Sequence, residues 1–207
     1  MDMTIDTSFI ERLSEGKPSP GGGSASAYCA ALAGACAAMA GNLTYINDNF
    51  KGVKAQLGES INRLNDVTSD LLFLVDADTK SFEPVLKAMR LPKGEIRDKK
   101  VDDALVCACD VPFEIMQKSL LVIDECDFVS DLCSKMTISD VGCGVLLAKA
   151  SLVCASLNVY ENVKLFKSDE LAKKYKLLAD SMCDEGCQKA DAIYSKIADQ
   201  LGAFRLI

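Results

Sequence analysis

Residues 18–24 read Pro18-Ser19-Pro20-Gly21-Gly22-Gly23-Ser24, and an uncharged run rich in alanine follows them as far as residue 41. Three consecutive glycines leave the main chain free of side chains and able to take backbone angles that other residues avoid. The two prolines keep this segment out of a helix, and Ser24 is of a residue type that favours the N-cap position. The stretch therefore predicts a bare loop before a helix over residues 25–41. That loop is either a cradle for an anion or for polar ligand atoms, or a tight turn into a buried helix.

The predicted helix over residues 25–41 is built mostly from alanine, glycine, serine and cysteine. At about 17 residues it reaches the short limit for crossing a membrane, but alanine and glycine gain little from contact with lipid. Small residues instead allow helix backbones to approach one another closely. We therefore expect this helix to be buried inside the protein or in a subunit interface.

The rest of the chain also has helical periodicity, because apolar residues recur three and four positions apart and no long stretch alternates with the period of a strand. Further helices are expected over four ranges: 50–89 with a kink or offset at Pro84, 97–129 with a kink or restart at Pro112, 141–165 and 169–201. Ser139 with Asp140, and Ser168, are expected to cap the last two. We predict an all-α fold, a helical bundle of about six to seven mostly antiparallel helices in one domain over residues 1–207.

Composition limits what this chain can do. It has 207 residues, of which 49% are hydrophobic, with a net charge of −7 and no histidine. An acidic surface disfavours nucleic acid and anionic membranes as partners. Without histidine, a Ser-His-Asp or Cys-His mechanism and a histidine-ligated metal are excluded, so proton transfer falls to carboxylates, lysine, tyrosine or cysteine. The first residues lack the features of a secretory signal, which favours a cytoplasmic location.

Ten cysteines are spread along the chain, and none of them forms a C-x-x-C motif. Most lie beside alanine, leucine and valine on expected helix faces, which is typical of small buried thiols in a reducing compartment. The pairs Cys107 with Cys109 and Cys183 with Cys187 are close enough in sequence to hold a metal, but their spacing matches no known site. We predict ten free thiols, no bound metal and no bound cofactor.

Several polar residues interrupt apolar helical stretches and are candidates for chemistry. Asp76 and Asp78 lie two positions apart, so on a helix they point roughly 200° apart, and an aspartate inside a helix is unfavourable unless it has a role there. At least one should face a cleft, although pairing of an exposed aspartate with Lys80 explains the pattern as well. Asn158 and Asn162 lie four positions apart on an apolar helix, which suggests a polar ligand or a polar contact between helices.

Two other positions have both a functional and a structural interpretation. Asp140 is either a functional carboxylate or only a helix cap. Lys93 follows Leu91 and Pro92 in a predicted loop. Its ammonium group either neutralises a substrate carboxylate or is simply solvated.

Four blocks occur in a specific order and spacing: Pro20-Gly21-Gly22-Gly23-Ser24 with Asn42-Leu43-Thr44; Leu74-Val75-Asp76-Ala77-Asp78 with Phe82; Ala88-Met89-Arg90-Leu91-Pro92-Lys93; and Ser139-Asp140 with Asn158-Val159 and Asn162. Together they resemble the cyclodeaminase/cyclohydrolase family, which includes the cyclodeaminase part of formiminotransferase-cyclodeaminase and stand-alone methenyltetrahydrofolate cyclohydrolases. The resemblance spans nearly the whole chain. It departs at residues 45–50, which stand where the family often has a Gly-Lys-Lys-Tyr-like stretch.

The resemblance implies a dimeric, all-helical enzyme with a folate cleft near the subunit interface. It implies Asp78 as the general acid/base, with Asp76 and Asp140 as alternatives. The backbone of Gly21, Gly22, Gly23 and Ser24 would then hold the reacting region of the folate. The remaining implied contacts are Asn158 and Asn162 to the pterin, Lys93 to a glutamate carboxylate, and Ser139.

The reaction expected from the resemblance is hydrolysis of methenyltetrahydrofolate to formyltetrahydrofolate, which needs neither a metal nor a covalent nucleophile because the amidinium carbon is already electrophilic. The alternative reaction is cyclodeamination of formiminotetrahydrofolate with release of ammonia. An alternative of another class is a non-catalytic helical dimer that binds folate. The acid at position 78 favours an enzyme over that last possibility.

Overall fold

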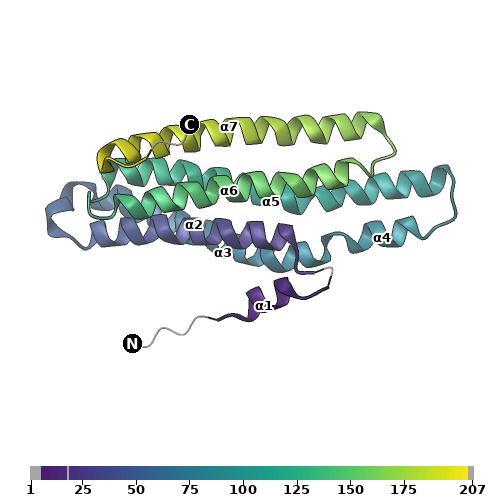
Figure 1. Cartoon of the computed structure of the whole chain (residues 1–207), viewed down its shortest axis with the longest axis horizontal. Coiled ribbons are helices and arrows are strands. Elements are labelled where there is room, and N and C mark those ends of the chain that lie inside the picture. The colour runs from purple at the N-terminus through teal and green to yellow at the C-terminus, as the bar shows by residue number, and fades with distance from the viewer. Residues whose placement is uncertain (1–5, 18, 205–207) are drawn as a thin grey trace.

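The computed structural model describes residues 6–17 and 19–204, and these residues form seven α-helices, one 3-10 helix and no strand (Figure 1). The prediction of an all-α bundle of about six to seven helices is therefore confirmed. In chain order the elements are α1 (Ser8–Ser14), α2 (Gly22–Tyr45), the 3-10 helix η1 (Asp48–Val53), α3 (Lys54–Ser81), α4 (Glu83–Met89), α5 (Glu95–Leu132), α6 (Ile138–Val163) and α7 (Asp169–Leu201).

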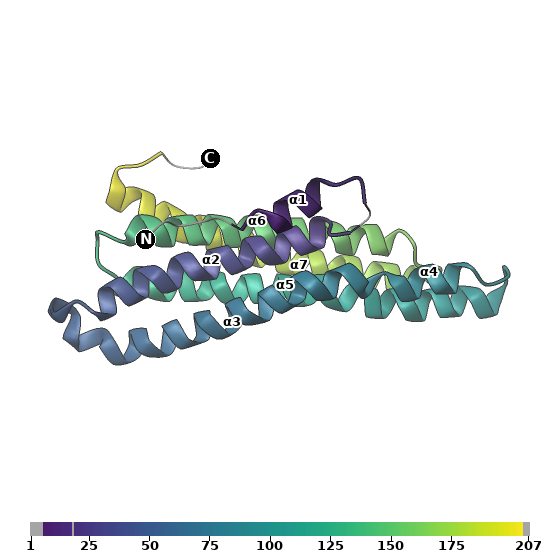
Figure 2. The same cartoon turned by 90° about the horizontal axis from the view of Figure 1, so that it is seen from below.

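The five long helices run along one common axis, as both views show (Figures 1 and 2). Helix α2 packs against α3, α5 and α6, and α7 covers α5 and α6 from the other side. Helix α4 and the first part of α5 extend beyond the rest of the bundle, where a second small core joins Val85, Val101 and Leu105. Helix α1 lies outside the bundle, and the ring of Phe9 lies 5.0 Å from that of Tyr28 on α2.

The small residues of α2 allow very close packing, as its sequence predicted. Most of its alanines and glycines are buried, and a Cβ added at Gly144 of α6 would lie only 3.0 Å from the carbonyl oxygen of Ala33. Helices α2 and α6 are both long and apolar enough to cross a membrane by length and composition alone, with mean hydropathy 1.3 and 1.6. Within the bundle, however, 61% of the most apolar 18-residue stretch of α2 and 50% of that of α6 are buried. The main core is therefore built on these two helices.

The two internal prolines have different consequences. The helix expected over residues 50–89 is interrupted, since α3 ends at Ser81 and Pro84 lies in the first turn of α4, where a missing N–H costs nothing. Pro112, by contrast, lies buried inside the continuous helix α5, so the expected kink or restart does not divide that helix. Packing of α5 against α2, α3, α6 and α7 offsets the lost hydrogen bond.

Two of the expected helix caps are wrong. Helix α2 begins at Gly22 with Gly21 as its N-cap, so Ser24 is the third helical residue rather than the cap. Helix α6 begins at Ile138 with Thr137 at the N-cap position, which puts Ser139 and Asp140 inside the first turn. The cap at Ser168 is confirmed, because its hydroxyl accepts a hydrogen bond from the backbone N–H of Leu171 at 3.3 Å.

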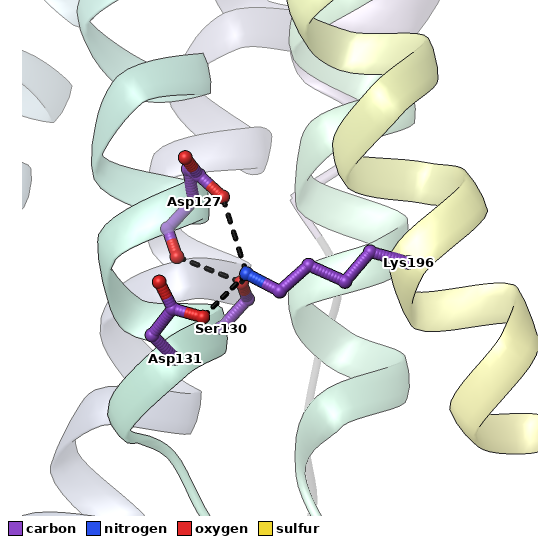
Figure 3. Close-up of polar contacts among 4 residues, drawn as sticks. All are labelled: Asp127, Ser130, Asp131 and Lys196. Atoms are coloured by element: carbon purple, nitrogen blue, oxygen red, sulfur yellow. Dashed lines mark hydrogen bonds and ion pairs between the residues drawn. The ribbon is translucent and has the colours of Figure 1, made fainter.

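Polar contacts also tie α7 to α5. Lys196 of α7 reaches the side chains of Asp127, Ser130 and Asp131 on α5, at 3.5 Å from Asp127 and 3.3 Å from Ser130 (Figure 3). Lys189, two turns earlier, pairs with Asp124 at 3.1 Å. The charged groups in these contacts are exposed, and exposed ion pairs contribute little each, so they fix the register of two helices more than they stabilise the fold.

Candidate active site

Asp78 of α3 lies directly at the N-terminus of α2. Its Oδ2 accepts two hydrogen bonds from Ser24, one from the backbone N–H at 2.7 Å and one from the hydroxyl at 2.9 Å. The N-terminus of a helix carries partial positive charge and N–H groups without intrahelical partners, which favour an anion there. The carboxylate of Asp78 therefore performs the capping role that the sequence had suggested for Ser24.

Gly23 is required by this arrangement. A Cβ at Gly23 would lie 2.1 Å from Oδ1 of Asp78 and 2.5 Å from its Cγ, which is far inside van der Waals contact. The glycine therefore lets the carboxylate approach the helix backbone closely. The glycines that the sequence predicted to form a bare loop are instead the N-cap and first turn of α2. They do hold an anion, and in this structure that anion is a side chain of the same protein.

A cavity of about 320 Å³ opens beside this contact. Its polar side chains come from Ser19, Asp78, Thr79, Ser81, Asn158, Glu161 and Asn162, while Phe82, Ala108 and Pro112 form an apolar wall. A second, more apolar cavity of about 320 Å³ lies alongside, between α2 and α6. The two share Gly22, Asn158 and Glu161, so they form one continuous surface with a polar part and an apolar part.

Both asparagines predicted from the sequence line the polar cavity, and each is fixed by a hydrogen bond to the backbone. Asn162 is buried and donates to the carbonyl oxygen of Ala108 at 3.2 Å, and Asn158 donates to that of Cys154 at 3.2 Å. The amide group of Asn158 faces the start of α2, since a Cβ at Gly22 would lie 3.8 Å from its oxygen and 3.9 Å from its nitrogen. Amides held in this way can offer both donors and acceptors to the edge of a heterocycle.

The structure brings together Asp78 of α3, the start of α2 at Gly21, Gly22, Gly23 and Ser24, and Asn158 and Asn162 of α6. Asp76 is exposed on α3, away from this cavity, as the two-residue spacing required. Asp140 and Ser139 lie at the other end of α6, about 27 Å along the helix from Asn158. Lys93 is exposed on the loop between α4 and α5. That loop leads into the first residue of α5, which lies roughly 20 Å along the helix axis from Ala108 in the cavity wall.

One lining residue was missed by the sequence analysis. Glu161 reaches both cavities, three positions after Asn158 and therefore on the same side of α6. That spacing was the available signal, but a glutamate beside Lys164 near a helix end is also typical of a solvated face. Among the residues that the structure describes, Glu161 and Asp78 are the two ionisable side chains that line the polar cavity.

The ten cysteines are free thiols in this structure, and no group of three potential metal ligands occurs within the described residues. Cys109 is buried close to Asn162, and burial raises the pKa of its thiol to about 11, with a smaller opposing effect from Asn162. Burial likewise raises the pKa of Cys126 to about 12. These two thiols are therefore protonated near neutral pH and make poor nucleophiles.

The fold and the cavity define a class of protein, an all-α bundle that holds a carboxylate at a glycine-rich helix start beside a polar pocket. The family model described as Formiminotransferase-cyclodeaminase matches residues 6–180. The chain belongs to this family, and the resemblance inferred from the sequence blocks is confirmed.

Known relatives include proteins with two different names. The chain is 33% identical over 188 residues to "Methenyltetrahydrofolate cyclohydrolase" of Methylorubrum extorquens, covering 86% of this chain and 90% of that protein. It is 26% identical over 195 residues to "Formimidoyltransferase-cyclodeaminase" of Sus scrofa, covering 91% of this chain but 36% of that protein. The crystal structure of formiminotetrahydrofolate cyclodeaminase from Thermotoga maritima superposes with a TM-score of 0.82 and 24% identity, covering 96% of each chain. This last likeness shows the fold alone.

Proposed function

We propose that this protein is a methenyltetrahydrofolate cyclohydrolase, with Asp78 as its general acid/base. The observation that carries the proposal is the fixed carboxylate of Asp78 in a cavity whose ionisable side chains are both acidic. Such a cavity suits a substrate whose reacting carbon is part of a cation. The relative named as a methenyltetrahydrofolate cyclohydrolase supports this assignment, because the match covers nine-tenths of that protein.

The proposed reaction follows from the chemistry of the substrate. Methenyltetrahydrofolate has an amidinium carbon between two nitrogens, and water adds to that carbon to form a C–O bond while a carboxylate takes one proton from the water. The resulting tetrahedral intermediate then breaks one C–N bond: the nitrogen gains a proton and the hydroxyl loses one to become the formyl carbonyl. Oδ2 of Asp78 is held by Ser24, so Oδ1 is the atom proposed to exchange protons with the substrate.

The two cavities suggest how the folate would be oriented. We propose that Asn158, Asn162 and the backbone of Gly21, Gly22 and Gly23 bind the pterin and the reacting region in the polar cavity. Ser24, predicted as a further contact, already donates its backbone N–H to Asp78 and would act by holding that carboxylate. Lys93 remains a predicted contact for a glutamate carboxylate of the substrate. Asp76, Asp140 and Ser139 lie outside this cavity within one chain, and their assigned roles stay predictions.

A paired assay separates the proposed activity from the alternative. The cyclodeaminase reaction is favoured by the family description and by the relatives that carry that name. We expect kcat/KM for methenyltetrahydrofolate hydrolysis, followed by loss of its absorbance, to exceed that for release of ammonia from formiminotetrahydrofolate. The reverse order would establish the cyclodeaminase. Folate binding with neither turnover would establish the non-catalytic alternative.

The outer face of α2 and α6 supports a second proposal, that the protein is a homodimer. Leu32, Met39 and Leu43 of α2 and Val153 and Leu157 of α6 are each between 38% and 57% exposed, and Leu157 also lines the apolar cavity. Large apolar side chains exposed along two neighbouring helices are typical of an interface. Sedimentation equilibrium should give twice the mass of the chain, and substitution of Leu32 and Leu157 by glutamate should give a monomer. A monomeric parent protein would refute the proposal.

We also propose that the protein is cytoplasmic and binds neither nucleic acid nor membrane. The net charge of −7 and the partial burial of α2 and α6 support this proposal. The predicted absence of a bound metal or cofactor is proposed on the chemistry of the substrate.

A further inference from the structure

We propose that Glu161 transfers the proton released by the hydrolysis from the cavity to solvent. This inference rests on the proposed cyclohydrolase function. In this proposal Asp78 exchanges protons with the reacting atoms, and Glu161 exchanges protons with bulk water.

The stoichiometry of the reaction requires such a route. A cationic amidinium and neutral water give a neutral formyl product, so each turnover releases one proton. The carboxylate that accepts the first proton from water must lose it before the next cycle. A second proton moves from the hydroxyl of the intermediate to the departing nitrogen. Because this proton stays within the site, it does not change the net release of one proton per turnover. One proton therefore has to leave the cavity each time.

Asp78 is poorly placed to release a proton to solvent by itself. It is half-buried, both donors of Ser24 hold its Oδ2, and Gly23 packs against its Oδ1 and Cγ. Its position is therefore fixed toward the substrate. A bound folate filling the polar cavity would further separate it from bulk water.

Glu161 has the complementary properties. It comes from α6, on another wall of the polar cavity, and it also lines the neighbouring apolar cavity. Its side chain is 73% exposed, and three rotatable bonds let the carboxylate move between the cavity and solvent. Of the two ionisable side chains described in the lining of the polar cavity, Glu161 is the one that also extends into bulk water.

The charged partner of Glu161 does not prevent this role. Lys164 pairs with its Oε1 at 2.7 Å, one helical turn further on, and 66% of the Lys164 side chain is exposed. Ion pairs between such exposed groups are weak and exchange readily with water. Asp78 is the other charged group that faces the same cavity.

The test is turnover of methenyltetrahydrofolate by Glu161→Gln at several buffer concentrations, after subtraction of the rate without enzyme. The amide keeps the shape of the side chain but cannot carry the proton. At low buffer concentration we expect kcat to fall roughly 10-fold with little change in KM, less than the ~10²–10⁴-fold loss typical of a positioned general base, because water still reaches the cavity. Raising the buffer concentration should restore kcat toward that of the parent protein.

Two control variants separate this role from a structural one. Glu114→Gln removes an exposed carboxylate of α5 outside both cavities, and Lys164→Ala removes the ion pair while keeping Glu161. Both should retain kcat within about twofold, without dependence on buffer. Unchanged kcat in Glu161→Gln, or a loss that buffer does not relieve, would overturn the proposal. Failure of the cyclohydrolase assignment itself is recognised separately, because the parent protein would then not hydrolyse methenyltetrahydrofolate.

Discussion

Replacement of Asp78 by asparagine should leave the bundle folded and reduce turnover of methenyltetrahydrofolate by ~100- to 10,000-fold, the usual loss for a positioned general base. The amide oxygen can still accept the hydrogen bonds of Ser24, so the start of α2 keeps its partner, but the amide cannot accept a proton. The loss should appear in kcat, with circular dichroism and thermal unfolding close to those of the parent protein.

The same helix provides the control for this experiment. Asp66 is exposed on α3 about three turns before Asp78 and lies outside the cavity, so Asp66→Asn should retain full turnover. Asp76→Asn and Asp140→Asn test the alternatives from the sequence. If Asp78→Asn kept near-normal kcat while one of these lost it, the role of general acid/base would move to that residue.

Gly23→Ala should cause the second largest loss of activity, by about 100-fold or more, since a displacement of ~1 Å at a reacting group can cost that much. The added methyl group would occupy the position now taken by the Asp78 carboxylate, at 2.1 Å from Oδ1. The group that gives way is therefore the catalytic side chain, while the core packing of α2 is left intact. Overpacking typically costs ~1–3 kcal/mol, so the fold should survive this substitution.

Gly52→Ala is the matched control, because a Cβ at Gly52 meets no atom within 4 Å. It should leave both kcat and unfolding temperature almost unchanged. Normal turnover in Gly23→Ala would show that the close approach of Asp78 to the helix is not needed for the reaction.

The sequence predicted the fold well because the evidence for it is local. Helical periodicity, the small residues of α2 and the cap at Ser168 each depend on neighbours within a few positions, and all are present in the structure. The effect of Pro112 could not be predicted, because whether a helix tolerates a buried proline depends on packing against helices far away in sequence.

The candidate site was only partly predictable, for a related reason. The glycines, Asp78 and the two asparagines were identified, but the choice between Asp76 and Asp78 requires the rotation of α3 relative to α2, which is a tertiary property. Ser24 was misassigned as a cap because its partner lies 54 positions away. Glu161 was overlooked because its surroundings in sequence resemble an exposed helix face, and only the packing of α6 beside α2 brings it to the cavity.

We expect folate chemistry to take place beside Asp78 at the start of α2. The most direct measurement is a crystal structure of the Asp78→Asn variant with methenyltetrahydrofolate, which that variant should bind but hydrolyse very slowly. We expect the bicyclic cation in the polar cavity, with its amidinium carbon within roughly 3.5 Å of a water beside position 78, close to the distance of a reactive approach. Folate bound elsewhere on the protein, with this cavity holding none, would contradict it.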